Sequence, residues 1–432
     1  MANPTRRSFS TKAVHAGQIP DSSTLSRAVP VYRTSSFTFN SAEHAANLFA
    51  LKEPGNIYSR LGNPTNDILE ARVTELEGGA ASVSVASGTA AIFYTVINIA
   101  RAGDEIVSAS NLYGGTYTMF DAILPELGIA TRFVDVRDPA NFERAITPKT
   151  RLVYLETIGN PALDVADVEA VSRIAKKHRL PLVVDATFTT PYLLRAIELG
   201  ADIVVNSLTK WLGGHGTAIG GIVTDAGSFD WSDPKFDLYV KPDKNLHGQR
   251  WAFDTTPELR KALFALRFRL VPLRNLGACL SPDNAWLFLQ GIETLHLRMP
   301  RHCENALAVA RHLESHPKVA WVRYPGLEKD PSHAVASRML SKGYGGMVVF
   351  GVKGGREAGG RFIESLELFS HVANVGDAKS LAIHPATTTH SQLSDAALAE
   401  AGVTADLVRL SIGIEEIGDI VADLDRALTA IG

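Results

Sequence analysis

"ADIVVNSLTKWLGGHG", residues 201–216, joins an apolar run to a lysine, two hydroxyl side chains and a cluster of glycines. The run "ADIVVNS" has the length and the β-branched content of a buried strand. Lys210 follows directly after it. A surface lysine needs no such setting, whereas a lysine that bonds covalently to a phosphorylated cofactor does. The rest of the sequence decides between these two interpretations.

Short apolar runs of the same kind recur upstream and alternate with segments of helical spacing. The runs expected to be strands are 82–87, 105–110, 130–135, 150–157, 180–187, 201–207 and 220–225. Apolar residues at helical spacing occupy 66–79, 88–103, 115–128, 167–179 and 192–200. Strands that alternate with helices predict an α/β fold with a mainly parallel, doubly wound sheet covered on both faces.

The remaining chain predicts an arm, an insertion and a second domain. A chain of 432 residues is too long for one simple core. Residues 1–63 are rich in Ser, Thr and Pro without sustained periodicity, so we interpret them as an irregular arm that contacts a neighbouring subunit. Residues 64–290 are expected to form the large cofactor domain, with 226–250 as a long loop or insertion. Residues 291–432 predict a smaller C-terminal α+β domain with strands at 319–326, 345–352 and 407–415.

Composition and charge exclude several classes of protein. The sequence is 45% hydrophobic and 21% charged, with a net charge of −3, which gives no electrostatic attraction to nucleic acid or anionic membranes. The two cysteines, Cys279 and Cys303, form no CxxC pair, so we expect neither a disulfide framework nor a zinc site. No apolar run is long enough to span a bilayer. Arg6, Arg7 and Lys12 precede no apolar segment, so we expect no secretory signal and a cytoplasmic location.

Polar side chains follow five of the predicted strands, where ligands bind in open α/β sheets. A helix opening at Ser87-Gly88-Thr89 offers backbone N–H groups and a helix dipole to an anion. Together the five strand ends supply the parts that hold pyridoxal 5'-phosphate: a lysine for the covalent link, a carboxylate for the ring nitrogen, an aromatic ring that stacks, and groups for the phosphate. The residues are Gly88 and Thr89; Tyr113; Asn160; Asp185 and Thr187; and Lys210 with Ser207 and Thr209.

Each of these residues alone has a plainer interpretation. Lys210 by itself would be a solvated loop residue, Asp185 a turn residue or helix cap, and Tyr113 a packing residue. Their expected placement at one sheet edge favours the cofactor interpretation. A nicotinamide-dependent oxidoreductase is the rival from another class, but no GxGxxG opens the first helix. An inactive binding protein is a third possibility, which the intact Lys-Asp-Tyr set disfavours.

The sequence closely resembles the cysteine/methionine-metabolism family of pyridoxal-phosphate enzymes, of fold type I, over almost its whole length. That family includes cystathionine synthases and lyases, methionine γ-lyases and the O-acylhomoserine sulfhydrylases. The motifs are long and specific, unlike a bare GxGxxG. They are "SLTKWLGGHGTAIGG" (207–221), "SGTAA" (87–91), "LYGGTY" (112–117), "VDATF" (184–188) and "YSRLGNPT" (58–65).

The resemblance implies a role for each matching residue. Lys210 would carry the cofactor and act as the base, Asp185 would keep the ring nitrogen protonated, and Tyr113 would stack on the ring and assist proton transfer. Arg409 would bind the substrate carboxylate through its two-pronged guanidinium, helped by Asn160 and Ser380. Phosphate contacts would come from Gly88, Thr89, Ser207 and Thr209, and from Tyr58 and Arg60 of a neighbouring subunit in a homotetramer built as a dimer of dimers.

Three longer stretches are most similar to the branch that acts on O-acetylhomoserine: 41–65, 280–299 and 374–390. The insertion at 226–250 also fits that branch. The resemblance then implies a γ-replacement in methionine biosynthesis, in which sulfide or a small thiol displaces acetate and gives homocysteine or methionine. It leaves open whether the acetyl or the succinyl ester is preferred, which sulfur donor is used, and how much lyase side activity accompanies the replacement.

Two departures bear on the alternatives within the family, cystathionine γ-synthase and methionine γ-lyase. Methionine γ-lyases carry a cysteine where this sequence has Gly115. Cystathionine-handling enzymes often carry an acidic residue where Lys379 precedes Ser380. A lysine there suits a substrate without a distal ammonium group, so both departures favour the replacement reaction over a lyase.

Overall fold

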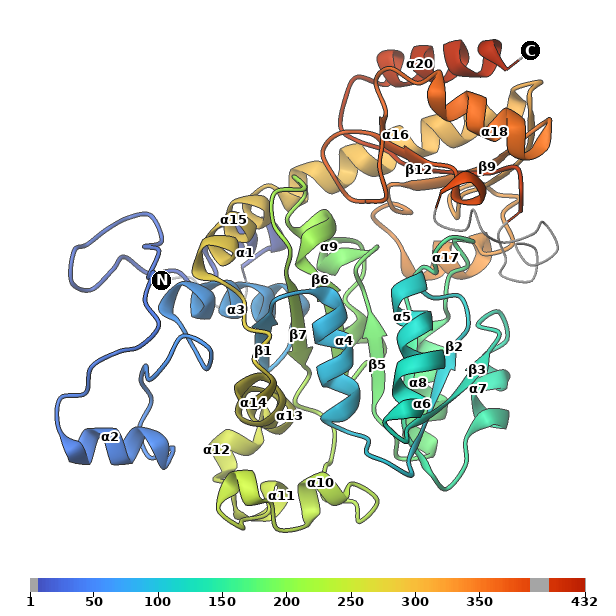
Figure 1. Ribbon diagram of the computed structural model, residues 1–432. Helices are drawn as coiled ribbons and strands as arrows, with labels where there is room; N and C mark the ends of the chain where they lie inside the picture. Colours follow the sequence, from blue (N-terminus) through green and yellow to red (C-terminus); the bar gives the residue numbers. More distant parts are fainter. Residues whose placement is uncertain (1–6, 389–403, 432) are drawn as a thin grey trace.

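The computed structural model describes residues 7–388 and 404–431 and contains two separate sheets (Figure 1). The larger sheet has seven strands in the order β1-β7-β6-β5-β4-β2-β3. Of these seven strands, β7 alone runs opposite to the other six. The predicted mainly parallel, doubly wound sheet is therefore confirmed. The strands are β1 (Ala81–Val85), β2 (Glu105–Ala109), β3 (Ala130–Val134), β4 (Thr150–Glu156), β5 (Leu182–Asp185), β6 (Ile203–Ser207) and β7 (Gly221–Asp225).

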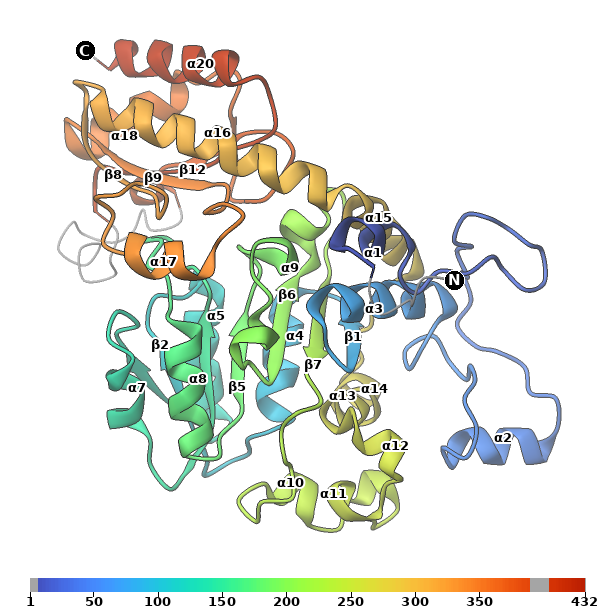
Figure 2. The same ribbon diagram turned by 180° about the vertical axis from the view of Figure 1, so that it is seen from behind.

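Helices cover both faces of this sheet, with α4 on one face and α8 on the other (Figures 1 and 2). Local chemistry sets their ends. The Asn63 side chain caps α3, whose first residue is Pro64, and Gly78 closes the helix with φ 77°. The helices are α3 (Pro64–Glu77), α4 (Gly88–Ile97), the continuous α5 (Gly114–Thr118), η2 (Met119–Ile123) and α6 (Leu124–Glu126), α7 (Ala140–Ala145), α8 (Val168–Lys177), α9 (Thr190–Leu193), η3 (Ala196–Leu199) and η4 (Leu208–Leu212).

The segment predicted as a loop at 226–250 is mostly irregular, and buried aromatic side chains join it to the large hydrophobic core. Trp231 is buried and stacks on Tyr239 with ring centroids 4.3 Å apart, and Phe236 packs edge-on against Trp231 at 5.3 Å. Buried aromatic area of this kind stabilises a segment that lacks periodic structure. Within this segment lie α10 (Asp237–Val240) and η5 (Lys244–Leu246), and after it follow α11 (Trp251–Asp254), α12 (Pro257–Arg260), α13 (Leu263–Phe268), η6 (Arg269–Leu273) and α14 (Arg274–Leu276).

The N-terminal arm is less irregular than the sequence predicts. Helix α1 (Phe9–His15) packs on the body through Ala13, and the buried Arg72 donates to the carbonyl of Ala16 at 3.0 Å. A second helix, α2 (Ala42–Phe49), lies farther along. Between and beyond these helices the chain extends away from the body (Figures 1 and 2) and exposes apolar side chains such as Leu25. Residues 1–6 of the predicted arm lie outside the described residues.

The C-terminal part forms a five-stranded sheet in the order β10-β11-β12-β9-β8. Two consecutive helices lead into it, α15 (Pro282–Glu293) and α16 (Leu295–Ser315). The strands are β8 (Val319–Arg323), β9 (Met347–Val352), β10 (Ser370–His371), β11 (Leu381–Ile383) and β12 (Leu407–Ser411). The other helices are α17 (His333–Met339), α18 (Gly355–Glu364), η7 (Pro385–Thr387) and α20 (Ile417–Ala430).

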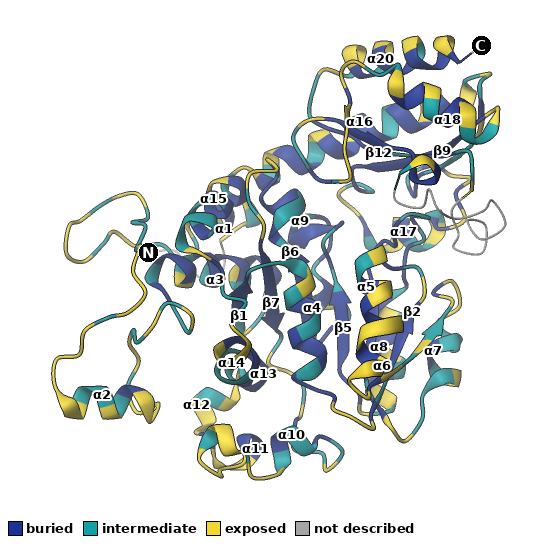
Figure 3. Ribbon diagram, in the orientation of Figure 1, coloured by how far each residue is buried: buried dark blue, intermediate teal, exposed yellow. Residues whose placement is uncertain are grey.

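Buried apolar side chains fall into two clusters, and β9 belongs to both. Met347 and Val349 point into the larger cluster, whereas Val348 and Phe350 point into the smaller one, as alternation along a strand requires. Figure 3 shows the buried strands of both sheets beneath more exposed helices. The small sheet is therefore packed directly against the large part of the molecule. Within the described ranges, no helix has both the length and the apolar character needed to cross a membrane.

Candidate functional site

The carboxyl ends of β1 to β6 lie at one edge of the large sheet, and five of these strand ends carry predicted site residues. Strands β2, β4, β5 and β6 are parallel. Strand β1 runs in the same direction, because β1 and β6 both lie antiparallel to β7. Their carboxyl ends therefore share one edge, which is where the predicted site residues follow.

Lys210 lies in η4, immediately after β6, where the backbone kinks (φ −95°, ψ −137°). Its amine is part-buried and donates a hydrogen bond to Oδ1 of Asn374, which belongs to the loop before β11. Burial, followed by the positive charge of Arg409, lowers the pKa of Lys210 to about 8. A lysine whose charged form is disfavoured in this way is suited to covalent chemistry and proton transfer.

Asp185 ends β5 and is the predicted partner of a ring nitrogen. The N–H of Thr187 donates to Asp185 Oδ1 at 2.9 Å, and the Tyr154 hydroxyl lies 3.5 Å from Oδ2. Burial raises the pKa of Asp185, and its register neighbour on β4 is the buried Glu156. A cationic ring nitrogen would relieve the cost of keeping this carboxylate charged. The buried carboxylate of Asp185 therefore fits the protonated nitrogen of a pyridine ring.

The predicted phosphate side lies where α4 meets β6. A Cβ built on Gly88 would come within 2.8 Å of Ser207 Cβ, so only glycine lets the two backbones approach this closely. The first turn of α4 directs N–H groups without intrahelical partners, including that of Thr89, toward this point. The Thr187 hydroxyl accepts from the Ser207 N–H at 2.8 Å. In contrast, the Thr209 hydroxyl is hydrogen-bonded to both the N–H and the C=O of Gly220.

Tyr113 begins the helix after β2, and its side chain is half exposed. The buried carboxylate of Glu156 accepts from the Tyr113 N–H at 2.7 Å, which fixes the backbone from which the ring projects. The ring lies over Gly115, because a Cβ there would be 2.6 Å from Tyr113 Cε1. The glycine that replaces the cysteine of methionine γ-lyases therefore leaves the space that this tyrosine occupies.

Arg409 on β12 reaches the same edge from the small sheet. Its Nη1 donates to Oδ1 of the buried Asn160 at 3.0 Å, and burial lowers its pKa to about 10. Its Nη2 lies 3.5 Å from the carbonyl oxygen of Asn374. Lys210, Asn374, Arg409 and Asn160 thus form one polar group drawn from both sheets. The sequence analysis missed Asn374; its place in a resemblance motif was the available signal.

Ser380 makes no hydrogen bond to this group, and its assignment to the substrate stays a prediction. Ser380 is fully buried, its hydroxyl donates to Glu415 at 3.0 Å, and it accepts from the N–H of Gly413 at 2.9 Å. The hydroxyl therefore donates one hydrogen bond and accepts one, both within the small sheet domain. Lys379, beside it, is exposed. Asn374, earlier in the same segment, is the residue that contacts Lys210.

Tyr58 and Arg60 lie on the extended arm and not beside Lys210. Both side chains are exposed, and the Arg60 guanidinium sits 5.0 Å from the centroid of the Tyr58 ring. The arm projects from the body in both views (Figures 1 and 2). These two residues are therefore free to contact another molecule, and their assignment to a neighbouring site stays a prediction.

Comparison with known proteins identifies the class. Residues 10–429 match the model of the Cys/Met metabolism PLP-dependent enzyme family, and the chain belongs to that family. It is 52% identical over 427 residues to an O-acetyl-L-homoserine sulfhydrylase of Leptospira meyeri, covering 98% of this chain and 96% of that protein. It is 48% identical over 423 residues to a homocysteine synthase of Schizosaccharomyces pombe, covering 97% and 98% of the two chains.

A solved structure supports the same conclusion. The crystal structure of an O-acetylhomoserine (thiol)-lyase from Campylobacter jejuni, described as putative, superposes with a TM-score of 0.93 at 39% identity, covering 98% of this chain and all of that chain. Its description names a pyridoxyl-lysine phosphate residue in that protein. The protein studied here uses pyridoxal 5'-phosphate, and the donor set around Lys210, Asp185 and Gly88 fits that cofactor.

Lys210→Ala should abolish turnover and remove the visible absorbance of the lysine-bound cofactor, because no other amine lies in this polar group. The absorption spectrum of the purified protein measures this directly. Lys235→Ala is the matched control, since Lys235 is a part-buried lysine that donates to the carbonyl of His178 at 2.9 Å. If the Lys210 variant kept the visible band, another lysine would carry the cofactor.

Arg409→Ala should raise KM for the amino-acid substrate and leave the cofactor spectrum nearly unchanged. Loss of one partner of a desolvated ion pair costs roughly 2–5 kcal/mol. That range corresponds to about thirtyfold up to several-thousandfold in kcat/KM. Steady-state kinetics measure the effect, with Arg426→Ala, a more exposed arginine of the small sheet domain, as control. An unchanged KM would remove Arg409 from the site.

Proposed function

We propose that the protein catalyses γ-replacement on O-acetyl-L-homoserine, in which sulfide or a small thiol displaces acetate and L-homocysteine or methionine is formed. The observation that carries this proposal is the polar group at the sheet edge, where Lys210 and the Arg409–Asn160 pair meet. The names of the relatives, which cover nearly the whole chain, agree with this reaction. In the proposal Lys210, Asp185 and Tyr113 are the catalytic residues.

Lys210 is the proton carrier. When bound, pyridoxal phosphate takes up the electrons left by removal of the substrate's α-proton. With a pKa of about 8, against 10.5 for an ordinary lysine, Lys210 has a much larger neutral fraction near neutral pH. A neutral Nζ can accept the α-proton and return it, which is efficient when the pKa lies close to the working pH. Asp185, held by the Thr187 N–H, balances the charge of the ring nitrogen.

Arg409 and Asn160 orient the substrate. The guanidinium offers parallel N–H groups that match a carboxylate, and Asn160 fixes one of its nitrogens. Asn374 links this carboxylate position to the base, because its side chain contacts Lys210 and its backbone carbonyl lies near Arg409. The substrate carboxylate and the base are thereby held at a fixed separation, which favours reaction at the α-carbon between them.

Assembly and location complete the proposal. The exposed Tyr58 and Arg60 would contact the phosphate of a neighbouring subunit, in a homotetramer built as a dimer of dimers. The division between a large domain (64–290) and a small domain (291–432) falls close to the break between α15 and α16. We place the enzyme in the cytoplasm, with small molecules and its own copies as its partners. The near-neutral charge gives no reason to expect nucleic acid or membrane binding.

The substrate assignment is tested by steady-state rates with O-acetyl- and O-succinyl-homoserine, each with sulfide and with methanethiol. We expect homocysteine from the acetyl ester and sulfide at the highest kcat/KM, with release of acetate. Cysteine as acceptor and methionine as sole substrate are the controls for cystathionine γ-synthase and methionine γ-lyase activity. Faster formation of cystathionine, or faster cleavage of methionine, would reassign the protein within its family.

The shared site is tested by mixing two inactive variants, Lys210→Ala and Arg60→Ala. In a mixed dimer one site carries both defects and the other carries neither. Random pairing makes about half of the dimers mixed, so about a quarter of all sites should be intact. The variants are unfolded together, refolded and assayed, with wild type refolded alongside. If activity only equals the sum of the two parents, Arg60 serves its own subunit.

A further inference from the structure

The turn that carries Asn160 connects β4 to α8 and is closed on itself. Gly159 N–H donates to the carbonyl of Asp164 at 2.9 Å, and Ile158 bridges Val165. The turn also packs tightly on the segment that leads to Tyr113, since a Cβ on Gly159 would lie 2.2 Å from Asn111 Nδ2. The turn therefore moves as a unit, and a shift at its far end is transmitted to Asn160.

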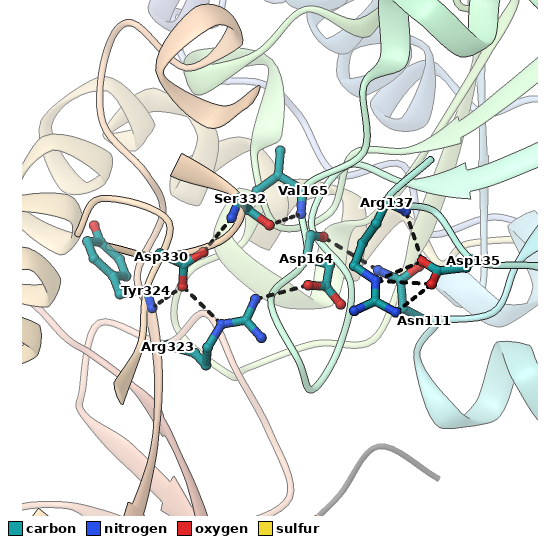
Figure 4. Close-up of polar contacts among 9 residues, drawn as sticks. All are labelled: Asn111, Asp135, Arg137, Asp164, Val165, Arg323, Tyr324, Asp330 and Ser332. Atoms are coloured by element: carbon teal, nitrogen blue, oxygen red, sulfur yellow. Dashed lines mark hydrogen bonds and ion pairs between the residues drawn. The ribbon is translucent and has the colours of Figure 1, made fainter. Parts of the chain in front are cut away.

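That far end is held by the small sheet domain through one arginine (Figure 4). Arg323, the last residue of β8, donates from Nη2 to Asp164 Oδ1 at 2.9 Å and from Nε to Asp330 Oδ2 at 3.0 Å. A planar guanidinium can make these two hydrogen bonds from two nitrogens held at a fixed angle, which the single ammonium of a lysine cannot reproduce. The Ser332 hydroxyl adds a second attachment by accepting from the Val165 N–H at 3.1 Å.

Asp330 makes this arginine rigid. Its side chain is fully buried, and it also accepts from the N–H groups of Tyr324 and Ser332. Arg323 and Asp164 are mostly buried as well, with 24% and 16% of their side chains exposed. An ion pair this well enclosed and this fully hydrogen-bonded fixes geometry better than a surface pair does. Both ends of the turn are thus fixed by the small domain, at Arg409 and at Arg323.

We propose that Arg323, by bridging Asp164 and Asp330, is a positioning residue that holds Asn160 in place for the substrate carboxylate. The proposal rests on the proposed role of Asn160. The neighbouring Arg137 cannot take over this task, because its Nε and Nη2 are hydrogen-bonded to Asp135 (Figure 4). Arg323 touches no reacting atom, so its effect should fall on substrate binding and not on the cofactor.

The test compares Arg323→Met with Arg137→Met, which removes the same charge beside the same turn but no bridge. Arg323→Met should raise KM for O-acetylhomoserine about tenfold, within the range for coupled contacts, with kcat changed less than about threefold. Arg137→Met should stay within about twofold on both constants. The visible spectrum of the unliganded holoenzyme should be the same in both variants and in wild type.

Two further measurements separate positioning from general damage. In an Asn160→Ala background, Arg323→Met should have no additional effect on KM, because the group it positions is gone. Titration of holoenzyme with L-alanine, followed by the cofactor's visible absorbance, should show the same weakening for Arg323→Met. This second readout stands even if O-acetylhomoserine is not the substrate, so failure of the proposed function would not be mistaken for failure of this proposal.

Asp164 provides a second variant should Arg323→Met fold poorly. Asp164→Ala leaves Arg323 paired with Asp330 and should raise KM to a similar extent, whereas Asp164→Asn keeps an oxygen acceptor and should recover most of the binding. An unchanged KM and alanine affinity in Arg323→Met or Asp164→Ala would overturn the proposal. So would an equal effect of Arg137→Met, or an Arg323→Met effect that persists in full without Asn160.

Discussion

The Lys210 amine lies where the two sheets of the molecule meet, and the other features of the site depend on that placement. Strand β6 delivers the lysine to the sheet edge, and Asn374 from the small domain receives its hydrogen bond. Burial and the nearby Arg409 charge together lower its pKa. If the small domain were absent, the amine would be solvated, its charge would no longer be disfavoured, and its carboxylate-binding neighbour would be lost.

The large sheet and the small sheet divide the chemistry between them. Asp185, Gly88 and Lys210 lie at the carboxyl-end edge of the parallel strands and fit the cofactor, whereas Arg409 and Asn374 come from the small domain and are proposed to act on the substrate side. The turn with Asn160 belongs to the large domain but is fixed by residues of the small one. If Arg323 and Asn160 act as proposed, substrate recognition depends on how accurately the two parts are docked.

The sequence predicted the parts of this structure that follow from local pattern. Alternating strands and helices give the direction of each strand, and parallel strands place Lys210, Asp185 and Tyr113 at one edge. The resemblance assigned Ser380 to the site and did not point to Asn374, whose contact with Lys210 depends on how the small domain packs. The aromatic core around Trp231 has no periodicity, and Asp164 and Arg323 are 159 residues apart in the chain. Such contacts arise only when the domains pack, and no local pattern encodes them.

The central claim is that Lys210, and no other lysine, carries the cofactor at this buried edge. Borohydride reduction of the holoenzyme makes the link permanent, and proteolysis followed by mass spectrometry then locates it. The account predicts a single pyridoxyl-modified peptide that contains Lys210, in an amount that matches the bound cofactor. A modification found chiefly on any other lysine, with Lys210 recovered unmodified, would contradict it.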